Sequence, residues 1–249
     1  MARAAVRRRL TWQLGTVVEV VAETDRTASI VLRVRDWPGH RAGQHVDVRL
    51  TAEDGYRAQR SYSIASAPDE DAVVLTVERL EDGEVSSYLV GELRVGDELE
   101  LRGPIGGYFV WEESMGGPLM LVAGGSGIVP LRAMLRHRLA RRSAVPVRLL
   151  YSARSHDELI YGEELNKVGE EAGVDVRVTL TREQPAGWHG YDRRIDRELI
   201  AEVAWPPVER ALAYICGPTA FVEAAADALV SSGYDPSRIR TERFGPTGR

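Results

Sequence analysis

The stretch AQRSYSIASAP, residues 58–68, places a guanidinium, a phenol and two hydroxyls at consecutive positions, in Arg60, Ser61, Tyr62 and Ser63. A guanidinium binds phosphate oxygens through a fork of parallel hydrogen bonds, an aromatic face can cover a planar ring, and a hydroxyl both donates and accepts. Side by side, these groups could serve a bound ligand. A solvated edge strand can carry the same residues, so this tetrapeptide alone does not decide between the two.

A glycine-rich turn follows an apolar run in LVAGGSGIVPLRAML, residues 121–135. Gly124, Gly125 and Gly127 let the backbone approach a ligand closely. A helix expected to begin near Ile128 directs its free N–H groups and positive dipole end at the same place, which predicts an anion site. The spacing is neither G-x-G-x-x-G nor that of a P-loop with its lysine, and such a turn is structural about as often as functional.

A second turn of this design occurs in YICGPTAFVEAAADAL, residues 214–229. A strand is followed by Cys216, Gly217 and Pro218 and then by a helix for which Thr219 is a suitable N-cap. Two ligand-facing turns on one sheet predict an extended ligand such as a dinucleotide.

The first half of the chain has its own candidate anion site in EDGEVSSYLV, residues 81–90. Gly83 precedes Val85 and Ser86 at the start of a short expected helix, where backbone N–H groups and hydroxyls could hold a pyrophosphate. The alternative is an N-capped surface turn.

The elements that carry these groups differ between the two halves. In the first half, apolar residues recur at every second position in six short runs, at residues 14–21, 29–34, 44–50, 60–66, 72–78 and 97–103. Six strands without a long helix predict a small antiparallel barrel or sandwich over residues 10–111.

The second half alternates between strand-like and helical patterns. The strand-like runs are at residues 119–123, 146–153, 174–180, 210–216 and 238–244. The helical stretches are at residues 129–142, 157–173, 196–203 and 219–233. This alternation predicts an α/β doubly wound parallel sheet over residues 117–249, joined to the first half by the linker EESMGGP at residues 112–118.

Composition limits the chemistry. With 249 residues, 44% apolar and 28% charged, the chain is long enough for two globular domains, and its net charge of −5 argues against a nucleic-acid or anionic-membrane surface. The single Cys216 cannot form an internal disulfide or hold an iron–sulfur cluster, so redox chemistry would need an organic cofactor. No metal site is expected, because the histidines lack ligand spacing: His40, His45, His137, His156 and His189.

Nothing in the sequence predicts a membrane protein. No apolar run reaches the length of about 18 residues that a membrane span needs. The arginine-rich start, MARAAVRRRL, is expected to be a basic tail before the first strand and not a targeting signal. We therefore expect a cytoplasmic protein.

The order of the motifs resembles that of the ferredoxin–NADP reductase superfamily of flavin-dependent reductases, over residues 12–245. The resemblance implies a six-stranded antiparallel β-barrel that binds flavin, followed by an α/β domain that binds NAD(P). It is carried by R-S-Y-S (60–63), T-V-E (76–78), G-E-V-S (83–86), G-P-I-G-G-Y-F (103–109), G-G-S-G-I-V-P (124–130), C-G-P (216–218) and T-E-R-F (241–244).

Roles for individual residues follow from the resemblance. It implies that Arg60 pairs with the flavin pyrophosphate, that Tyr62 stacks on the isoalloxazine and that Ser63 hydrogen-bonds near flavin N5. FAD is favoured over FMN, because the pyrophosphate turn is present. The remaining flavin contacts that it implies are Ser61, Thr76, Val77, Glu78, Gly83, Val85, Ser86, Ser126 and Phe244.

The resemblance also implies the nicotinamide side of the site. Cys216 matches a cysteine that orients the nicotinamide without a covalent intermediate, and with Ser63 and Glu242 it completes the expected catalytic group. Phe244 matches an aromatic residue that covers the flavin, although five residues follow it here. The expected NAD(P) turns comprise Gly124, Gly125, Gly127, Cys216, Gly217 and Pro218.

NADPH is favoured over NADH because its 2′-phosphate calls for arginines near the ends of the second and third strands of the α/β domain. Ser152 and Arg154 follow the second of these strands, and Arg182 and Arg194 follow the third. Solvated surface arginines are the alternative.

We thus expect a monomeric, FAD-dependent NAD(P)H oxidoreductase. It would take hydride from NADPH or NADH and pass single electrons to a separate acceptor, such as a ferredoxin or an oxygenase component. The chain has too few cysteines for a fused iron–sulfur domain. The alternatives are a ferric or free-flavin reductase, and a non-catalytic nucleotide-sensing or electron-transfer subunit of a larger complex.

Overall fold

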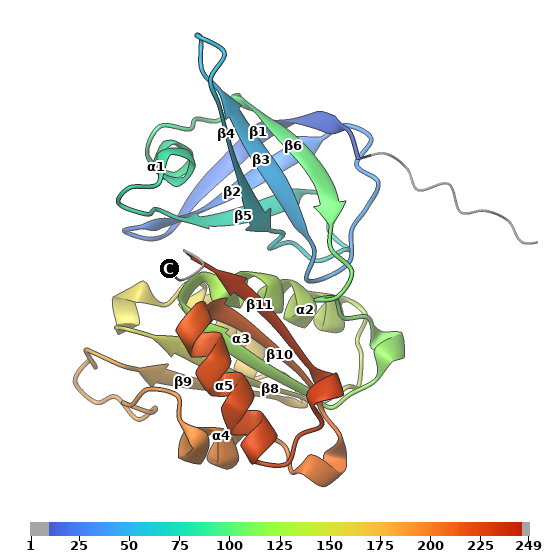
Figure 1. The fold of residues 1–249 in the computed structure, drawn as a ribbon, viewed down its shortest axis with the longest axis vertical. Coiled ribbons are helices and arrows are strands. Elements are labelled where there is room, and N and C mark those ends of the chain that lie inside the picture. The colour runs from blue at the N-terminus through green and yellow to red at the C-terminus, as the bar shows by residue number, and fades with distance from the viewer. Residues whose placement is uncertain (1–9, 246–249) are drawn as a thin grey trace, which may run out of the picture.

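The alternating apolar residues of the first half form a six-stranded antiparallel sheet in a computed structural model that describes residues 10–245 (Figure 1). The expected basic tail at residues 1–9 and residues 246–249 lie outside this range. The strands are β1 (Trp12–Thr24), β2 (Thr27–Val34), β3 (His45–Thr51), β4 (Arg57–Ser63), β5 (Val73–Glu78) and β6 (Glu98–Ile105). Their order in the sheet is β4-β3-β6-β1-β2-β5.

Alternation of side chains builds the core of this sheet. In β2, Ile30 and Leu32 are fully buried whereas Arg33 is exposed, as a period of two requires. Beyond the end of β4, an isolated bridge joins Ile64 to Leu75 of β5, so the two edge strands meet there and the sheet curls into a barrel. The short helix α1 (Glu84–Gly91) packs beside β4 and β5. The prediction of a six-stranded barrel is confirmed.

The second half forms a five-stranded parallel sheet with helices on both faces, again as predicted. The strands are β7 (Leu119–Gly124), β8 (Val147–Ala153), β9 (Val174–Leu180), β10 (Leu212–Pro218) and β11 (Ile239–Phe244), in the order β11-β10-β7-β8-β9. The helices are α2 (Ile128–Ala140), α3 (Gly162–Gly169), α4 (Arg197–Val203) and α5 (Thr219–Ser231). Helices α2 and α3 share one apolar core with one face of the sheet, and α4 and α5 share another with the opposite face.

Two local predictions were wrong. The single helix expected over residues 157–173 is a short 3-10 turn followed by α3, because Tyr161 takes a left-handed conformation, with φ of 62°, that interrupts a right-handed helix. Thr219 is not an N-cap. It is the first residue of α5, and Pro218 occupies the cap position without a side-chain hydrogen bond.

The two domains share packed residues. Phe109 and Trp111, which follow the last barrel strand, are buried in the core of the α/β domain together with Ala42 and Ala65 of the barrel. The hydroxyl of Tyr214 in β10 donates a hydrogen bond to the carbonyl of Val110 at 2.8 Å. The interface is therefore a continuation of the α/β core.

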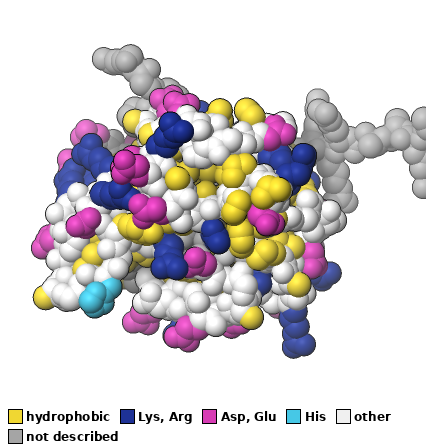
Figure 2. All heavy atoms as spheres, turned by 90° about the horizontal axis from the view of Figure 1, so that it is seen from below, with side chains coloured by type: hydrophobic (Ala, Val, Ile, Leu, Met, Phe, Trp, Pro, Cys, Tyr) yellow, Lys and Arg dark blue, Asp and Glu magenta, His cyan; other side chains and the backbone are white. Residues whose placement is uncertain are grey.

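The face of the molecule seen from below in Figure 2 has no large area that is only basic or only acidic. Acidic and basic side chains are interspersed there (Figure 2). Nucleic acid needs a continuous basic surface, which this face does not offer. In the part of the chain that the structure describes, no helix has the length and apolar character to cross a bilayer.

Candidate active site

The two predicted glycine turns lie against each other, because β7 and β10 are neighbours in the sheet. A Cβ atom on Gly127 would lie 2.1 Å from the carbonyl oxygen of Cys216 and 2.8 Å from the backbone nitrogen of Gly217. Only glycine permits this approach. Gly125 differs, since it has a φ of 55° and a Cβ there would meet nothing within 4 Å. The site thus has a closely packed floor at Gly127 and open space at Gly125.

Two other glycines of these turns have a packing role that the sequence analysis missed. A Cβ on Gly124 would lie 2.8 Å from the ring of Phe221, and one on Gly217 would lie 2.7 Å from it. Phe221 is in the first turn of α5, next to the second glycine turn. An aromatic residue so close to this turn is the sequence signal that could have indicated the packing role of the two glycines. Packing alone explains why Gly124 and Gly217 lack side chains.

The first turn leads directly into a helix. Gly125, Ser126 and Gly127 form a 3-10 turn that continues as α2 from Ile128, so the N–H groups of the first helical turn lie at the carboxyl end of β7. Ser152, at the end of β8, is in register with Gly124 and half-buried. An anion at this edge of the sheet would meet free N–H groups and hydroxyls.

Cys216 and Glu242 are partners on adjacent strands, β10 and β11, and Pro218 and Phe244 are partners at the ends of the same strands. Cys216 is 2% exposed, and burial, with a smaller contribution from Glu242, raises the pKa of its thiol well above the ordinary value. The thiol is therefore protonated and no nucleophile. Phe244 is half-buried and packs against the α/β core.

One carboxyl oxygen of Glu242 has no partner among the described residues. Its Oε2 atom is buried and makes no hydrogen bond within residues 10–245, and burial raises the pKa of Glu242 to about 7. Buried polar atoms in native proteins are almost always hydrogen-bonded. An unsatisfied carboxyl beside the two glycine turns fits a site completed by a bound polar ligand.

This carboxyl predicts a pH dependence of stability in the flavin-free protein. Its native pKa of about 7 lies above the ordinary 4.5, so its stabilising contribution is complete below about pH 4.5 and is lost as the pH rises through 7. This difference in pKa corresponds to about 3 kcal/mol in the free energy of unfolding. Urea unfolding of the wild type and of Glu242→Gln measures it at about pH 4.5 and about pH 8. Between these two pH values, we expect the free energy of unfolding to decrease by about 3 kcal/mol more in the wild type than in Glu242→Gln. Equal decreases would contradict the argument that burial raises the pKa of Glu242.

On the barrel side, β4 runs toward the α/β domain (Figure 1). Arg60 is exposed and donates to the carbonyl of Gln59 at 2.6 Å, and in the described chain it has no carboxylate partner. Tyr62 is half-buried against the barrel core, which raises the pKa of its phenol to about 12. Ser63, the last residue of β4, is half-buried. An uncommitted guanidinium next to an aromatic ring fits an anionic aromatic ligand.

The hydroxyl of Ser61 has a different partner. It donates to Asp47 at 2.7 Å, and Arg102 binds the same carboxylate at 2.6 Å. The Ser61 side chain thus belongs to a hydrogen-bonded cluster on the barrel wall. The predicted contact between Ser61 and flavin would therefore have to come from its backbone atoms.

The α1 turn is closed by its own serine. The Oγ atom of Ser86 accepts from the N–H of Leu80 at 3.1 Å and donates to the carbonyl of Gly83 at 3.2 Å. A Cβ on Gly83 would lie 2.3 Å from that Oγ atom. The hydroxyl therefore shapes the turn, and the N–H groups of Glu84, Val85 and Ser86 remain without intrahelical acceptors.

Thr76 and Val77 of β5 have buried side chains. The hydroxyl of Thr76 bonds to Ser29 at 2.8 Å and accepts a hydrogen bond from Tyr161, and Val77 is buried in the barrel core. Glu78 is half-buried. Backbone atoms are what Thr76 and Val77 can offer to a ligand.

The predicted 2′-phosphate arginines fall into two positions. The carbonyl of Arg154 accepts the N–H of Arg182 at 2.9 Å, so the loops after β8 and β9 lie side by side. Both side chains are exposed, and neither has a carboxylate partner among residues 10–245. Arg194 is exposed further along the chain, where the neighbouring Arg193 pairs with Glu202 at 2.5 Å.

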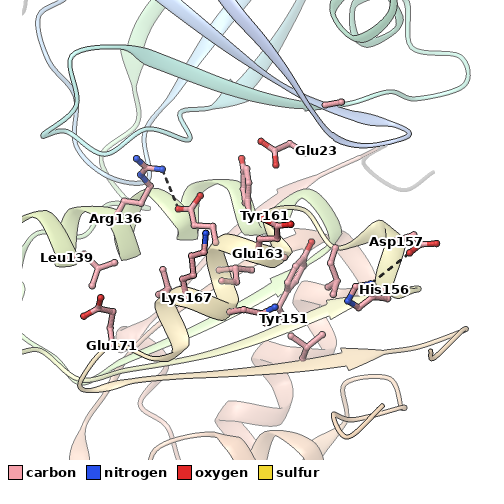
Figure 3. Close-up of a pocket in the computed structure, with 18 of the residues that line it drawn as sticks. Glu23, Arg136, Leu139, Tyr151, His156, Asp157, Tyr161, Glu163, Lys167 and Glu171 are labelled. Atoms are coloured by element: carbon pink, nitrogen blue, oxygen red, sulfur yellow. Dashed lines mark hydrogen bonds and ion pairs between the residues drawn. The ribbon is translucent and has the colours of Figure 1, made fainter. Parts of the chain in front are cut away.

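The predicted residues do not line every hollow of the surface. A groove of about 1180 Å³ lies between the barrel and α3, and no predicted site residue lines it (Figure 3). Glu23, Tyr161 and Lys167 are among its lining residues. The candidate active site is instead the region between β4, α1 and the two glycine turns.

Comparison with known proteins gave matches over both halves. A family model described as oxidoreductase FAD-binding domain matches residues 16–110, and one described as oxidoreductase NAD-binding domain matches residues 121–227. The aromatic O-demethylase reductase subunit of Amycolatopsis sp. is 30% identical over 93% of this chain and 69% of that protein. The glycine betaine monooxygenase reductase subunit of Chromohalobacter salexigens is 32% identical over 82% of this chain.

The chain spans 56% of the length of that glycine betaine relative. Among solved structures, the FAD/NAD-binding domain of nitric oxide dioxygenase from Vibrio cholerae superposes with a TM-score of 0.83. That alignment covers 94% of this chain and 99% of the other, at 28% identity.

Proposed function

Because this chain belongs to the ferredoxin–NADP reductase superfamily of flavin-dependent oxidoreductases, we propose that it is an FAD-dependent NAD(P)H oxidoreductase that delivers electrons to a separate acceptor protein. When bound, the nicotinamide supplies a hydride and the flavin divides the electron pair into single electrons. The observation that carries the proposal is the meeting of the two glycine turns at Gly127 and Cys216, beside the unpartnered carboxyl of Glu242.

On the flavin side, we assign phosphate binding to Arg60 and to the N–H groups of Val85 and Ser86. The exposed guanidinium, which has no carboxylate partner among residues 10–245, and the N–H groups without intrahelical acceptors at the start of α1 suit a pyrophosphate, which favours FAD over FMN. Tyr62 would cover one face of the flavin ring, and Ser63 would offer a hydroxyl to its edge.

On the nicotinamide side, the turn from Gly124 to Gly127 would hold the phosphates at the start of α2. The protonated thiol of Cys216 would orient the ring by contact, and Glu242, with a pKa of about 7, would hold a proton that it can donate in a hydrogen bond. These residues contribute position and hydrogen bonding to the reaction.

The test is anaerobic. The purified protein is mixed with NADPH, and separately with NADH, while the visible absorption of the flavin is followed. We expect a yellow protein that is bleached by NADPH, and a Cys216→Ala variant that keeps its flavin and is bleached more slowly. A protein that stays colourless after FAD is added would overturn the proposed function, and a wild-type bleaching rate in Cys216→Ala would remove the role of the thiol.

We further propose that NADPH is preferred, because Arg154 and Arg182 are joined by a backbone hydrogen bond at the ends of β8 and β9, and their exposed side chains have no carboxylate partner among residues 10–245. Arg154→Glu is expected to weaken NADP+ binding about tenfold or more, since a charge-assisted hydrogen bond is lost and repulsion is added, and to leave NAD+ unchanged. Titration of the flavin spectrum with each nucleotide measures both affinities.

Arg177→Glu is a matched control, because Arg177 is an exposed arginine of β9 that already pairs with Asp175 at 2.8 Å. It should change neither affinity. Equal weakening of NADP+ and NAD+ by Arg154→Glu would contradict the phosphate assignment.

The electron acceptor is proposed from the relatives. Two of them carry names of reductase subunits of oxygenating enzymes, a glycine betaine monooxygenase and an aromatic O-demethylase. We therefore propose a ferredoxin or an oxygenase component as the acceptor. Reoxidation of the reduced protein by an added [2Fe–2S] ferredoxin, compared with a ferric chelate, tests the choice, and faster reoxidation by the chelate would favour a ferric reductase.

A further inference from the structure

Arg132 is a buried cation that contacts both domains. It lies one turn into α2, just beyond the glycine turn, and is 9% exposed. Its Nε and Nη2 atoms donate to Glu164 of α3 at 2.9 and 2.6 Å, and its Nη1 atom donates to the carbonyl of Ala65 at 3.2 Å. Ala65 follows Ser63 of β4 by two residues. One guanidinium thus connects the helix that begins at the nucleotide turn to the end of the flavin strand.

Tyr161 completes the connection. The guanidinium carbon of Arg132 lies 4.2 Å from the centroid of the Tyr161 ring, and the Tyr161 hydroxyl donates to Thr76 of the barrel. From Thr76 the hydrogen bonds continue through Ser29 to Glu23, at 2.8 and 2.5 Å. Figure 3 shows Tyr161 and Glu23 directed toward each other across the space between the barrel and α3.

The backbone of Tyr161 indicates that this arrangement is imposed by its surroundings. Its left-handed conformation, with φ of 62°, costs about 1–3 kcal/mol in a residue with a bulky side chain, and it persists only where the structure around it holds it. Tyr161 is 5% exposed and fixed by both Arg132 and Thr76. Two further polar contacts from α2 reach the segment before β5, from Arg136 to Glu70 at 2.7 Å and from His137 to Asp69 at 2.5 Å, and the first of them is half-exposed.

We propose that Arg132 and Tyr161, with Ala65, Thr76 and Glu164, form an interdomain clamp that sets the separation between the flavin strand and the nicotinamide turn. Arg132 is then a positioning residue for the proposed reaction, and this inference rests on the proposed function. A displacement of about 1 Å between reacting groups can lower a rate about 100-fold, so a contact that fixes the two domains within that tolerance controls the transfer step.

The chain offers a matched control on the same helix. Arg138 is 5% exposed and donates to the carbonyls of Val145 and Ala172, both at 2.9 Å. It is as buried as Arg132 and also donates to backbone carbonyls, although Arg132 has a carboxylate partner in addition, and the printed hydrogen bonds of Arg138 lie within the α/β domain. Arg132→Met and Arg138→Met therefore remove comparable buried arginines, and only the first change acts between the domains.

The experiment uses the full chain with FAD and has two readouts. In stopped-flow reduction at saturating NADPH, we expect Arg132→Met to lower the first-order rate constant about tenfold or more, with the dissociation constant of NADPH changed less than about threefold. The long-wavelength charge-transfer absorbance of the nucleotide complex should weaken in parallel. Arg138→Met should be less stable than the wild type but should keep its rate constant. Tyr161→Phe, which keeps the ring under Arg132 and loses the bond to Thr76, should fall between the wild type and Arg132→Met.

The second readout is calorimetry of the flavin-free protein, which needs no turnover. We expect one unfolding transition for all three proteins, because the domains share an apolar core. In Arg132→Met the transition should be broader, with a ratio of van't Hoff to calorimetric enthalpy below that of the wild type and of Arg138→Met, because the coupling between the domains is weaker. An unchanged enthalpy ratio together with a wild-type rate constant in Arg132→Met would overturn the clamp. An equally large decrease of the rate constant in Arg138→Met would also overturn the clamp. A wild type that binds no flavin would overturn the proposed function instead, and the calorimetry would still test the clamp.

Discussion

Replacing Gly127 with alanine is expected to slow reduction by NADPH about 100-fold or more. The added methyl group would lie 2.1 Å from the carbonyl oxygen of Cys216, and the atoms it meets are backbone, which cannot rotate away as a side chain would. The turns after β7 and β10 must then separate, which costs at least about 1–3 kcal/mol of stability. The groups that hold and orient the nicotinamide move apart, and we expect the rate constant for reduction to fall about 100-fold or more.

Gly125→Asn is the control for this prediction. Gly125 has a φ of 55°, which asparagine tolerates, and a Cβ there would meet nothing within 4 Å. It should therefore fold with stability close to that of the wild type. Thermal unfolding and stopped-flow reduction are measured for both variants, with dithionite as a reductant that bypasses the nucleotide. Gly127→Ala reduced by NADPH at the wild-type rate would show that contact between the two turns is not needed.

Arg60→Ala is expected to lose FAD. The guanidinium is exposed and has no carboxylate partner among residues 10–245, so its removal leaves no buried charge behind and the fold should be unaffected. A charge-assisted hydrogen bond contributes about 1.5–3 kcal/mol, which corresponds to about a 10- to 100-fold weaker affinity for FAD. Arg60→Lys should recover part of it, because lysine keeps the charge and loses the fork.

Fluorescence titration of the flavin-free protein with FAD and with riboflavin separates the causes. Arg60→Ala should weaken FAD and leave riboflavin, which has no phosphate, unchanged. Arg57→Ala removes an exposed arginine from the other end of the same strand and should change neither. If Arg60→Ala weakened both ligands equally, the residue would act on the ring site and not on the phosphates.

Both domain architectures could be predicted from periodicity. The period of two in β2 and the alternation of strands and helices after residue 117 result from burial of one face of each element, and that information is local to each segment. The turns at Gly127 and Cys216 were also predicted, because glycine after an apolar run is a local signal. Each of these predictions needs only residues that are close in the chain.

The contacts between distant segments could not be predicted in this way. Tyr161 was placed inside a helix, since nothing local marks a tyrosine for a left-handed conformation. Phe221 was overlooked because its partners, Gly124 and Gly217, meet it only in the folded sheet. Arg132 carried a usable signal, because it is a charged residue on the same helical face as the buried Ile128 and Leu135. A charge on an apolar face requires a partner, and the partners of Arg132, Glu164 of α3 and the carbonyl of Ala65 in the barrel, lie far from it in the sequence.

The position of β10 beside β7 has a consequence for synthesis of the chain. The turn at Gly127 leaves the ribosome with β7 and α2, but the carbonyl of Cys216 that packs against it belongs to a strand made much later. Until β10 pairs with the free edge of β7, the anion site has one wall. A nucleotide stabilises only the states that bind it. In the cell it can therefore stabilise the completed sheet, but it cannot stabilise the partly folded chain that exists before β10 is made.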